Sequence, residues 1–472
     1  MSSNLKGKSK VVNMPHTYVL LISIMIIMAV LTYVIPAGEY VREVDEATKR
    51  TVVDPNSFQW IENSPVNLFG VFKAIPKGMV DGATITFFIF LVAGSFQIIT
   101  STGAIEAGIY KIAKVLKGKE HLLIPIFMIA FSFTGAFMGF SEENMIFIPI
   151  AIALARALGY DALVGMSLIT IGGACGFYSA MMNPFTVGVA QGIAELPMFS
   201  GIGLRFVVWI VLLVVSISYV MLYAKKVRKN PELSLVADLE KAERHENKMD
   251  LNDHIELKTN HILVFLTLII GFAFIVYGVY KFEWYINEIA AVFLMMGVIS
   301  GLISKFSPNQ MAKEFVVGAR GIVFGALVVG LARGILVVMQ QGKILDTIIY
   351  QLASILVILP KSLAAVGMYI VQIIINFFMP SGSGQAAATM PIMIPLADIL
   401  GITRQTAVMA FQFGDGFSDS IIPTASSLMA TLSLAHISYD KWIKYLGKLM
   451  LIWLSIGAIF IVIANAISYG PF

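Results

Sequence analysis

A run of loop-forming residues interrupts one of the long apolar segments of this chain of 472 residues. The apolar segment continues up to Phe378, breaks at Pro380–Gln385 with the sequence PSGSGQ, and resumes at Ala386–Leu400. Non-helical backbone is tolerated at membrane depth only where protein or a water-filled cavity satisfies its polar groups. Broken helices of this kind surround the binding sites of many transporters. The pattern predicts a re-entrant hairpin at about residues 361–400.

The composition is that of an integral membrane protein. Hydrophobic residues make up 58% of the chain and charged residues 13%, and the mean hydropathy is +0.83. The first apolar segment, residues 19–35, is too long for a signal-peptide core, so we expect a retained span. The single Cys175 excludes a disulfide framework. We expect no cofactor and no nucleic-acid partner, and the absence of a glycine-rich phosphate loop argues against ATP-driven transport.

The lysines beside the apolar segments predict the topology. Lys6, Lys8 and Lys10 precede the first span, so the positive-inside rule places the N-terminus in the cytoplasm. Residues 224–258 are rich in charge and predict a cytoplasmic linker between a first half, residues 1–223, and a second half, residues 259–472. We expect a multi-pass protein of a prokaryotic plasma membrane (a cell inner membrane).

The two halves repeat each other. Leu158-Gly159 corresponds to Leu400-Gly401 at a spacing of 242, and Gly176-Phe177 corresponds to Gly416-Phe417 at 240. One extra span, residues 261–280, precedes the second repeat, so its topology should be inverted. The first repeat then carries its own hairpin at about residues 121–158. The predicted fold class is an all-α polytopic membrane protein with inverted repeats and two re-entrant helical hairpins, whose tips meet near the membrane midplane.

The predicted tip of the first hairpin is acidic: it contains Ser141, Glu142, Glu143 and Asn144. A carboxylate inside a membrane costs roughly 2.5–3.5 kcal/mol on insertion scales, so it needs a cationic partner or a proton. The tip could therefore recognise an ammonium or guanidinium group, a metal cation or a proton. The alternative is a turn that protrudes into water.

A second acidic pair lies near the end of the chain, four residues apart and on one face if the segment is helical. Nearby glycines permit unwinding, and Pro423 breaks a helix, which frees carbonyls that could join the carboxylates around Na⁺. In the first half, a span that we expect to be interrupted near Gly172–Pro184 offers Asn183 but no carboxylate. The candidates for an ion or a substrate cation are Gly414, Asp415, Ser418, Asp419 and Thr424.

The second tip offers hydroxyl, amide and backbone N–H groups: Ser381, Gly382, Ser383, Gly384 and Gln385. The positive end of the helix that begins there favours a carboxylate. A basic amino acid would fit both tips, with its α-carboxylate at the second tip and its cationic side chain toward the acidic residues. Arg333 is a candidate either for the substrate carboxylate or for a structural ion pair. If its span is one helix, Arg320 and Arg333 lie about 220° apart on it.

Four segments resemble the YfcC-type family of basic amino-acid antiporters, which is grouped with the C4-dicarboxylate carriers and with the ion transporter superfamily. These segments are Met14–Tyr18, Gly330–Ile335, Met379–Ala386 and Gly414–Thr424. The resemblance covers nearly the whole chain except the linker. It implies a homodimer with scaffold and transport domains and elevator-like alternating access, and it implies arginine–ornithine exchange as the activity.

The sequence therefore predicts a secondary active transporter and not an enzyme, with a small-molecule substrate and the lipid bilayer as partners. We expect an exchanger of basic amino acids; the alternative is a Na⁺- or H⁺-coupled carrier of dicarboxylates or short-chain acids. The coupling ion, Na⁺ or H⁺, stays open. A membrane-embedded protease is disfavoured because the GFSD sequence after Asp415 lacks the Gly-x-Gly-Asp motif and no HExxH motif is present. A passive channel suits paired hairpins less well than alternating access does.

Overall fold

The computed structural model describes residues 17–470 except 45–50, 55, 117, 142, 184, 247–256, 283 and 285. The described chain is predominantly helical. Six of its helices are long and apolar enough to cross a membrane, or seven if the bent pair Pro308–Gly321 and Ala326–Gln341 counts as one span. This confirms a multi-pass membrane protein.

The first half contains α1 (Thr17–Leu31), β1 (Gly38–Glu39), β2 (Arg42–Val44), β3 (Thr51–Val53), β4 (Gln59–Trp60), α2 (Leu68–Asp81), α3 (Ala83–Ser101), α4 (Ala104–Val115), η1 (Glu120–Leu122), α5 (Leu123–Phe133), the π-helical η2 (Thr134–Met138), η3 (Glu143–Phe147), α6 (Ile148–Ala157), α7 (Ala162–Ser179), α8 (Val187–Ile193) and α9 (Ile202–Lys229). Next come η4 (Pro231–Leu233) and α10 (Ala237–Glu246). The second half contains α11 (Thr259–Phe282), α12 (Ile286–Ile303), α13 (Pro308–Gly321), α14 (Val323–Gln341), α15 (Leu345–Leu356), α16 (Lys361–Phe378), α17 (Gly382–Leu400), α18 (Arg404–Asp419), α19 (Ser426–Leu434) and α20 (Tyr439–Ala466).

Several helices of the two halves match in order and in length. α2 and α13 contain 14 residues each and begin 240 residues apart, at Leu68 and Pro308. α3 and α14 contain 19 residues each and keep the same spacing, and α9 and α20 contain 28 each. α2 packs against α14, and α13 packs against α3, so each half completes the packing of the other. The inverted orientation of the halves stays a prediction.

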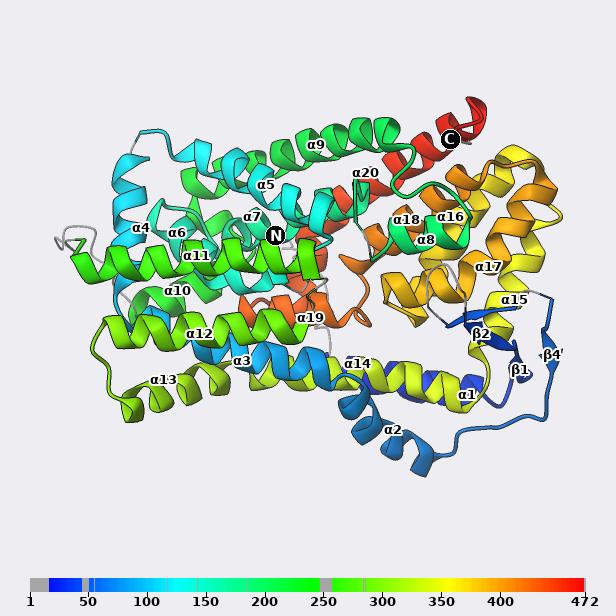
Figure 1. Ribbon diagram of the computed structural model, residues 1–472, viewed down its shortest axis with the longest axis horizontal. Coiled ribbons are helices and arrows are strands. Elements are labelled where there is room, and N and C mark those ends of the chain that lie inside the picture. Colours follow the sequence, from blue (N-terminus) through cyan, green and yellow to red (C-terminus); the bar gives the residue numbers. More distant parts are fainter. Residues whose placement is uncertain are drawn as a thin grey trace, which may run out of the picture.

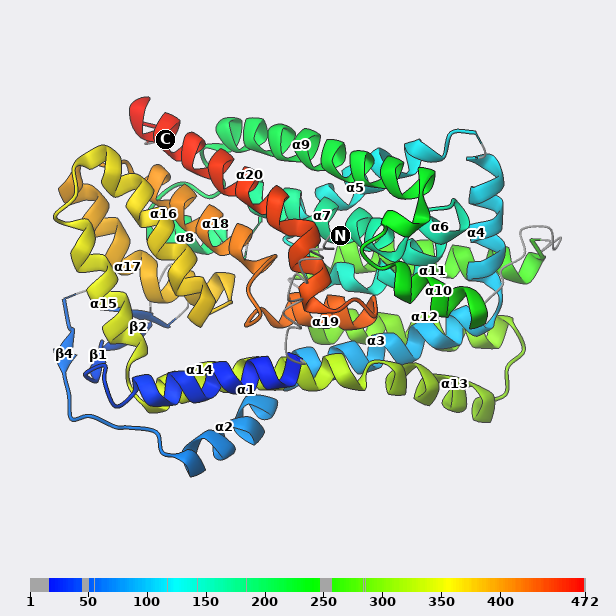
Figure 2. The same cartoon turned by 180° about the vertical axis from the view of Figure 1, so that it is seen from behind.

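The helices form two layers (Figures 1 and 2). The α3–α14 layer contains α1, α2, α3, α11, α12, α13 and α14, and the α7–α18 layer contains α5–α9, α16–α18 and α20. α19 packs between them, against α14 on one side and α20 on the other. α4 and α15 stand at opposite ends of the molecule, and each carries the chain from the first layer to the second.

α7 is the central helix of its layer. It is apolar all round and its side chains are mostly buried, as expected for a helix surrounded by protein. Its glycines allow very close packing against the first hairpin: a Cβ on Gly176 would overlap the carbonyl oxygen of Ser132 on α5. The sequence analysis expected an interruption near Gly172–Pro184; α7 remains helical to Ser179, and the break follows within that range, after the glycines. Here glycine serves packing between helices instead of unwinding.

A second difference concerns the two arginines of the second half. The helix breaks at Ile322, between α13 and α14. Arg320 and Arg333 therefore belong to different helices, and the angle of 220° expected for one continuous helix was wrong. The corresponding break in the first half is at Gly82, between α2 and α3.

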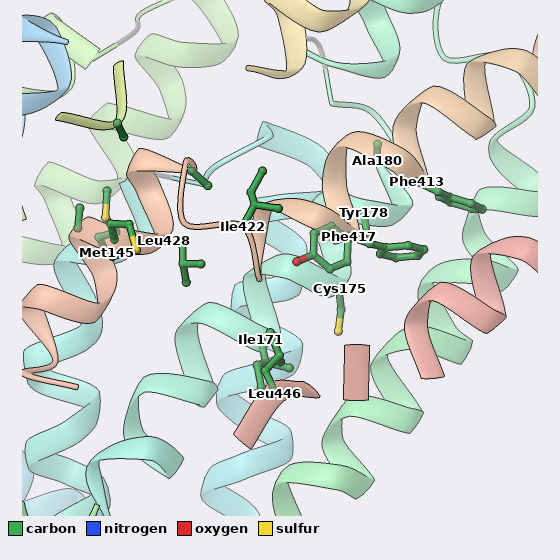
Figure 3. Packing of buried hydrophobic residues seen from close by; sticks show 14 of the residues in the cluster. Met145, Ile171, Cys175, Tyr178, Ala180, Phe413, Phe417, Ile422, Leu428 and Leu446 are labelled. Carbon is green, nitrogen blue, oxygen red and sulfur yellow. The ribbon is translucent and has the colours of Figure 1, made fainter. Parts of the chain in front are cut away.

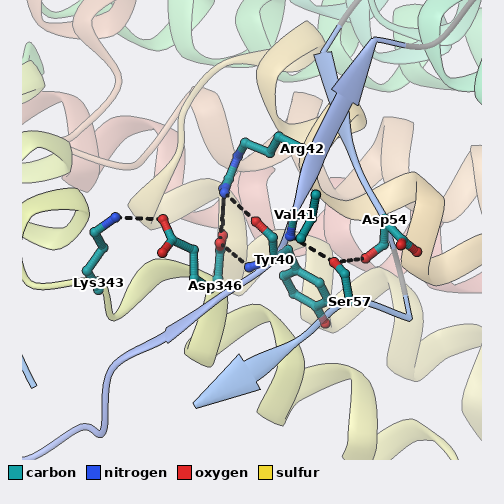
Figure 4. Close-up of polar contacts among 8 residues, drawn as sticks. Tyr40, Val41, Arg42, Asp54, Ser57, Lys343 and Asp346 are labelled. Atoms are coloured by element: carbon teal, nitrogen blue, oxygen red, sulfur yellow. Dashed lines mark hydrogen bonds and ion pairs between the residues drawn. The ribbon is translucent and has the colours of Figure 1, made fainter. Parts of the chain in front are cut away.

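Four short strands, which the sequence analysis did not anticipate, hold residues 38–44, 51–54 and 56–60 against α15 (Figure 4). β1 pairs with β4, and β2 pairs with β3. Arg42 donates two hydrogen bonds to Asp346, with N–O distances of 3.0 and 2.8 Å, and the backbone N–H of Tyr40 donates to the same carboxylate at 3.0 Å. Burial of Tyr40, with Asp346 nearby, raises the pKa of the Tyr40 hydroxyl. Paired charged hydrogen bonds of this kind fix the start of α15.

The predicted linker contains a docked helix. α9 extends to Lys229, six residues into the linker, and α10 then packs against the α7–α18 layer. The carboxylate of Glu240 accepts hydrogen bonds from Arg156 at 3.0 Å and from the backbone N–H of Ala162 at 2.9 Å. Lys441 at the start of α20 pairs with Asp238, which lowers the pKa of the Asp238 carboxyl. The linker is therefore attached to the ends of α6, α7 and α20.

We expect Gly176→Ala to destabilise the protein, because the added methyl group meets backbone that cannot move away; overpacking typically costs about 1–3 kcal/mol. The matched control is Gly447→Ala on α20, where an added Cβ meets nothing within 4 Å. Thermal unfolding of the purified protein should show a lower midpoint for Gly176→Ala only. Equal midpoints in the two variants would contradict the close packing of α5 on α7.

Candidate functional site

Four breaks in the helices meet in the α7–α18 layer. They lie between η2 and η3, between α7 and α8, between α16 and α17, and between α18 and α19. The groups around them form the candidate site.

The last turn of α18 is the centre of this site. Asn376 on α16 donates from Nδ2 to the carbonyl oxygen of Asp415 and to Ser418 Oγ, both at 2.8 Å, and to Asp419 Oδ1 at 2.9 Å. Asp415 and Asn376 are fully buried. α18 is helical up to Asp419, so the two aspartates lie four residues apart on one face.

The second tip lies directly against this turn. α17 begins at Gly382, and its N-cap Ser381 makes no side-chain capping bond. A Cβ on Gly382 would lie 2.5 Å from Thr186 Cγ2 and 3.2 Å from Asp415 Oδ2. The Asp415 carboxylate is therefore close to the positive end of the α17 dipole, the place that the sequence analysis gave to a substrate carboxylate. Thr186, from the first half, closes the other side of this contact.

A small cavity of about 70 Å³ lies on the first-tip side of the site. Its polar lining comprises Ser141, Asn144, Thr170, Tyr178, Asp419, Ser420, Ser427 and Thr431. Asp419 is the one carboxylic acid among the described residues of this lining, and its ionised form would favour a cation in the cavity. Ligand pockets usually measure about 300–1,000 Å³, whereas one water takes about 30 Å³ of liquid. In this conformation the cavity has room for an ion or a few waters.

The first tip is held by Asn144. Its side chain accepts from Thr134 Oγ1 and donates to the carbonyl oxygen of Phe140, both at 3.1 Å. A Cβ on Gly173 of α7 would lie 2.7 Å from Asn144 Nδ2, so the amide packs on bare backbone. Glu142 and the side chain of Glu143 lie outside the described residues. Their predicted role in cation recognition stays a prediction.

Side chains satisfy the carbonyls that the breaks set free. Gln412 donates to the carbonyl oxygen of Phe177 at 2.9 Å, and Thr424 donates to that of Phe377 at 2.7 Å. Trp442 donates to the carbonyl oxygen of Ser420 at 2.8 Å. These three carbonyls are occupied by protein groups, whereas the Asp419 carboxylate and several hydroxyl groups line the cavity.

The ends of α7 and α18 are joined by an aromatic cluster (Figure 3). The Tyr178 hydroxyl hydrogen-bonds to Ser420 Oγ. Its ring packs edge-on against Phe417, with centroids 5.0 Å apart, and against Trp453 at 5.3 Å. The two broken helices therefore meet end to end, and the residues after each break are positioned by one rigid contact.

The remaining predicted site residues lie at different distances from this centre. Asn183 accepts from the backbone N–H of Phe185 at 2.9 Å and shapes the loop before Thr186. Gln385 donates to Gln372 Oε1 at 2.7 Å, inside the second hairpin. Ser383 and Gly384 belong to the first turn of α17. Gly414 lies one turn before Ser418 on the side of α18 that faces α16, where an added Cβ would overlap Gln372.

Arg333 is not brought to either tip by its described contacts. Its Cγ lies 3.3 Å from the position of a Cβ on Gly82, at the junction of α2 and α3 in the other layer. It does not line the cavity. The structural role that the sequence analysis left open for Arg333 is the one that this position favours.

Two residues of the site were missed in the sequence. Asn376 was given no role in the sequence analysis, although an amide inside an apolar helix is itself a signal of function. Thr186 gave no signal, because its importance depends on the approach of Gly382 from the other half. Among the described residues, no three His, Cys, Asp or Glu side chains are grouped to hold a metal ion.

Known proteins resemble this chain over nearly its full length. The family model of DcuC, the C4-dicarboxylate anaerobic carrier, matches residues 14–466. The Escherichia coli K12 protein named "Putative basic amino acid antiporter YfcC" is 36% identical, with 97% of each chain covered. An uncharacterized protein of Haemophilus influenzae Rd is 29% identical, covering 97% of this chain and 98% of that protein.

Solved structures resemble it less closely. The YdaH transporter of Alcanivorax borkumensis gives a TM-score of 0.43 at 14% identity, covering 97% of this chain and 100% of that one. MtrF of Neisseria gonorrhoeae, described among antimetabolite efflux pumps, gives a TM-score of 0.43 at 15% identity, with 96% of each chain covered.

We expect Gly382→Ala to destabilise the site by about 1–3 kcal/mol, because its methyl group would press on the Thr186 methyl. Thr186→Ser removes that methyl group and keeps the hydroxyl. The double variant should therefore recover most of the thermal midpoint lost by Gly382→Ala, while Thr186→Ser alone changes it little. If Thr186→Ser gives no recovery, the second tip does not rest on the loop after α7.

Proposed function

This chain belongs to the DcuC, C4-dicarboxylate anaerobic carrier family and is a membrane transporter; from this premise we propose that it is a secondary active transporter that exchanges basic amino acids such as arginine and ornithine. The observation that carries the proposal is the charge of the site. Asp415 and Asp419 lie on the last turn of α18, and none of the described residues that line the adjoining cavity is an arginine, a lysine or a histidine. A cationic cargo fits these carboxylates directly.

The geometry around Asp415 supports an amino acid as the cargo. The start of α17 offers N–H groups for a carboxylate, and the Asp415 carboxylate beside it can accept from an ammonium group. The α-carboxylate and α-ammonium groups of an amino acid lie close together. The N–H groups at the start of α17 and the Asp415 carboxylate also lie close together. The cationic side chain would then extend toward Asp419 and the first tip, where Glu142 and Glu143 follow Ser141 in the sequence. The name of the Escherichia coli relative is in keeping with this cargo.

The second candidate is a Na⁺- or H⁺-coupled carrier of carboxylates. It is favoured by the start of α17, which suits an anion, and by the name of the family. In this case Na⁺ or protons at Asp415 and Asp419 would compensate the charge of the substrate. The cavity beside Asp419 has the size of an ion site.

We propose alternating access for either cargo. The α7–α18 layer would carry the site past the α3–α14 layer, which would form the interface of a homodimer. The matching helix lengths of the two halves support an inverted repeat, with hairpins that enter from opposite membrane surfaces and an N-terminus in the cytoplasm. Such a movement would expose the site to each side in turn.

Counterflow in proteoliposomes tests the function. Vesicles loaded with ornithine should accumulate labelled arginine without a Na⁺ gradient, whereas empty vesicles should not. Dicarboxylate uptake that requires Na⁺, with no response to arginine, would reject the exchanger and establish the second candidate. Asp415→Asn should abolish arginine exchange; the matched control is Glu232→Gln, which neutralises an exposed carboxylate of the linker.

Cysteine labelling tests the inverted repeat. The natural Cys175 is buried and hydrogen-bonds to Ser216 Oγ, so a Cys175→Ser background provides a chain without thiols. We expect Ser141→Cys and Ser383→Cys to react with impermeant reagents from opposite sides of sealed vesicles, because the hairpins should open toward opposite surfaces. Reaction of both from the same side, with and without arginine, would contradict this topology.

A further inference from the structure

A second cavity, outside the transport site, lies at the lysine-rich end of α9. Its volume is about 640 Å³, within the roughly 300–1,000 Å³ typical of ligand pockets. The start of α5, the last turns of α9 and the side chain of Tyr160 line this cavity. The transport site makes no use of it.

The cavity has a basic rim and an apolar wall. Lys225, Arg228, Lys229 and His121 form the rim, and Ile124, Met221, Leu222 and Ala224 form the wall. Arg228 is held in place by an ion pair with Glu120 at 3.1 Å and by packing over the Tyr160 ring. Because Glu120 balances Arg228, the surplus positive charge comes from Lys225 and Lys229, for which the described residues provide no carboxylate within ion-pair distance.

The wall continues into an exposed apolar line along α9. Phe206, Ile210, Val214 and Leu222 are exposed by 40–71% and follow one another at intervals of four or eight residues, so they form an inclined line that turns by about 160° around the helix. Val214 and Leu222, about 80° apart, share one face with Ser218. Ser218 and Leu222 border the cavity. Exposed apolar side chains of α5, Ile126 and Ile129, lie close to the same end. The line leads from the second turn of α9 to the two lysines.

The length of α9 sets the depth of the cavity. Twenty-eight residues span about 42 Å at 1.5 Å each, whereas the hydrocarbon core of a bilayer is about 30 Å thick. The final turns of α9 therefore reach the headgroup region. Cations at that depth above an apolar groove match a phosphate headgroup attached to acyl chains.

We propose that this cavity binds one anionic phospholipid, with its headgroup phosphate at Lys225 and Lys229 and its acyl chains along the exposed face of α9. Zwitterionic lipids bind more weakly, because their headgroup brings a positive charge to a rim that is already positive. Soluble phosphate has no acyl chains, so it cannot make the apolar contacts along α9.

Native mass spectrometry of the full-length protein in detergent tests the proposal. Phosphatidylglycerol should be retained as a single bound lipid, and phosphatidylcholine with the same acyl chains should not. Lys225→Gln/Lys229→Gln should weaken retention of phosphatidylglycerol roughly tenfold or more, since each cation near a headgroup contributes to binding. The matched control is Lys226→Gln, which removes the same charge from the neighbouring position outside the cavity lining and should retain the lipid.

Three results would overturn the proposal. These are equal retention of phosphatidylglycerol by the double variant and the wild type, equal retention of the two lipids by the wild type, and protection of the wild type against thermal unfolding by inorganic phosphate as strong as that by phosphatidylglycerol. The last result would assign the site to a soluble anion. Substitution of exposed lysines usually changes the free energy of unfolding little. Equal thermal midpoints of the variants and the wild type without lipid would therefore verify that the double variant is folded.

Discussion

The demand for hydrogen-bond partners at the helix breaks determines how this molecule is put together. A backbone carbonyl or N–H left unpaired inside a membrane costs several kcal/mol, and four breaks in one layer free many such groups. Asn376, Gln412 and Trp442 reach carbonyls at the breaks from three different helices, and Thr424 does so from the loop after α18. Groups at one break therefore satisfy groups at another. The candidate site is where these polar groups gather.

The two halves of the candidate site differ in charge: one is acidic and the other is uncharged. The end of α18 carries Asp415 and Asp419, whereas the corresponding end of α7 carries Tyr178 and Ser179. The Tyr178 hydroxyl contacts Ser420, so the uncharged half supports the charged one. The helix dipoles act in the same direction. The C-terminal ends of α7 and α18 both point into the candidate site, and the negative end of each dipole favours a cation. A site built from two equal acidic halves would need twice the compensating charge.

The sequence was most informative where a residue type has one physical use in a membrane. The PSGSGQ segment marked the break before α17, and the apolar runs located the spanning helices, because few other structures tolerate these patterns. Glycine was ambiguous, because in a membrane helix it permits either unwinding of that helix or close packing against another helix. Gly172 and Gly176 serve close packing against α5. The contact of Gly382 with Thr186 and the docking of Glu240 on Arg156 depend on residues far apart in the chain. Such pairings have no local signal, and a single sequence does not reveal them.

The reciprocal packing of α2 on α14 and of α13 on α3 has a consequence for biosynthesis. When the ribosome has finished α3, two of its packing faces have no partner, and they acquire one only after α13 and α14 have been made, more than two hundred residues later. During that interval the early helices must either remain in the bilayer as separate spans or bind other proteins of the insertion machinery. Release of a fragment that ends in the linker would leave the α3–α14 layer half built. The membrane quality-control proteases of the cell would then meet small-residue helix faces that the complete protein never displays.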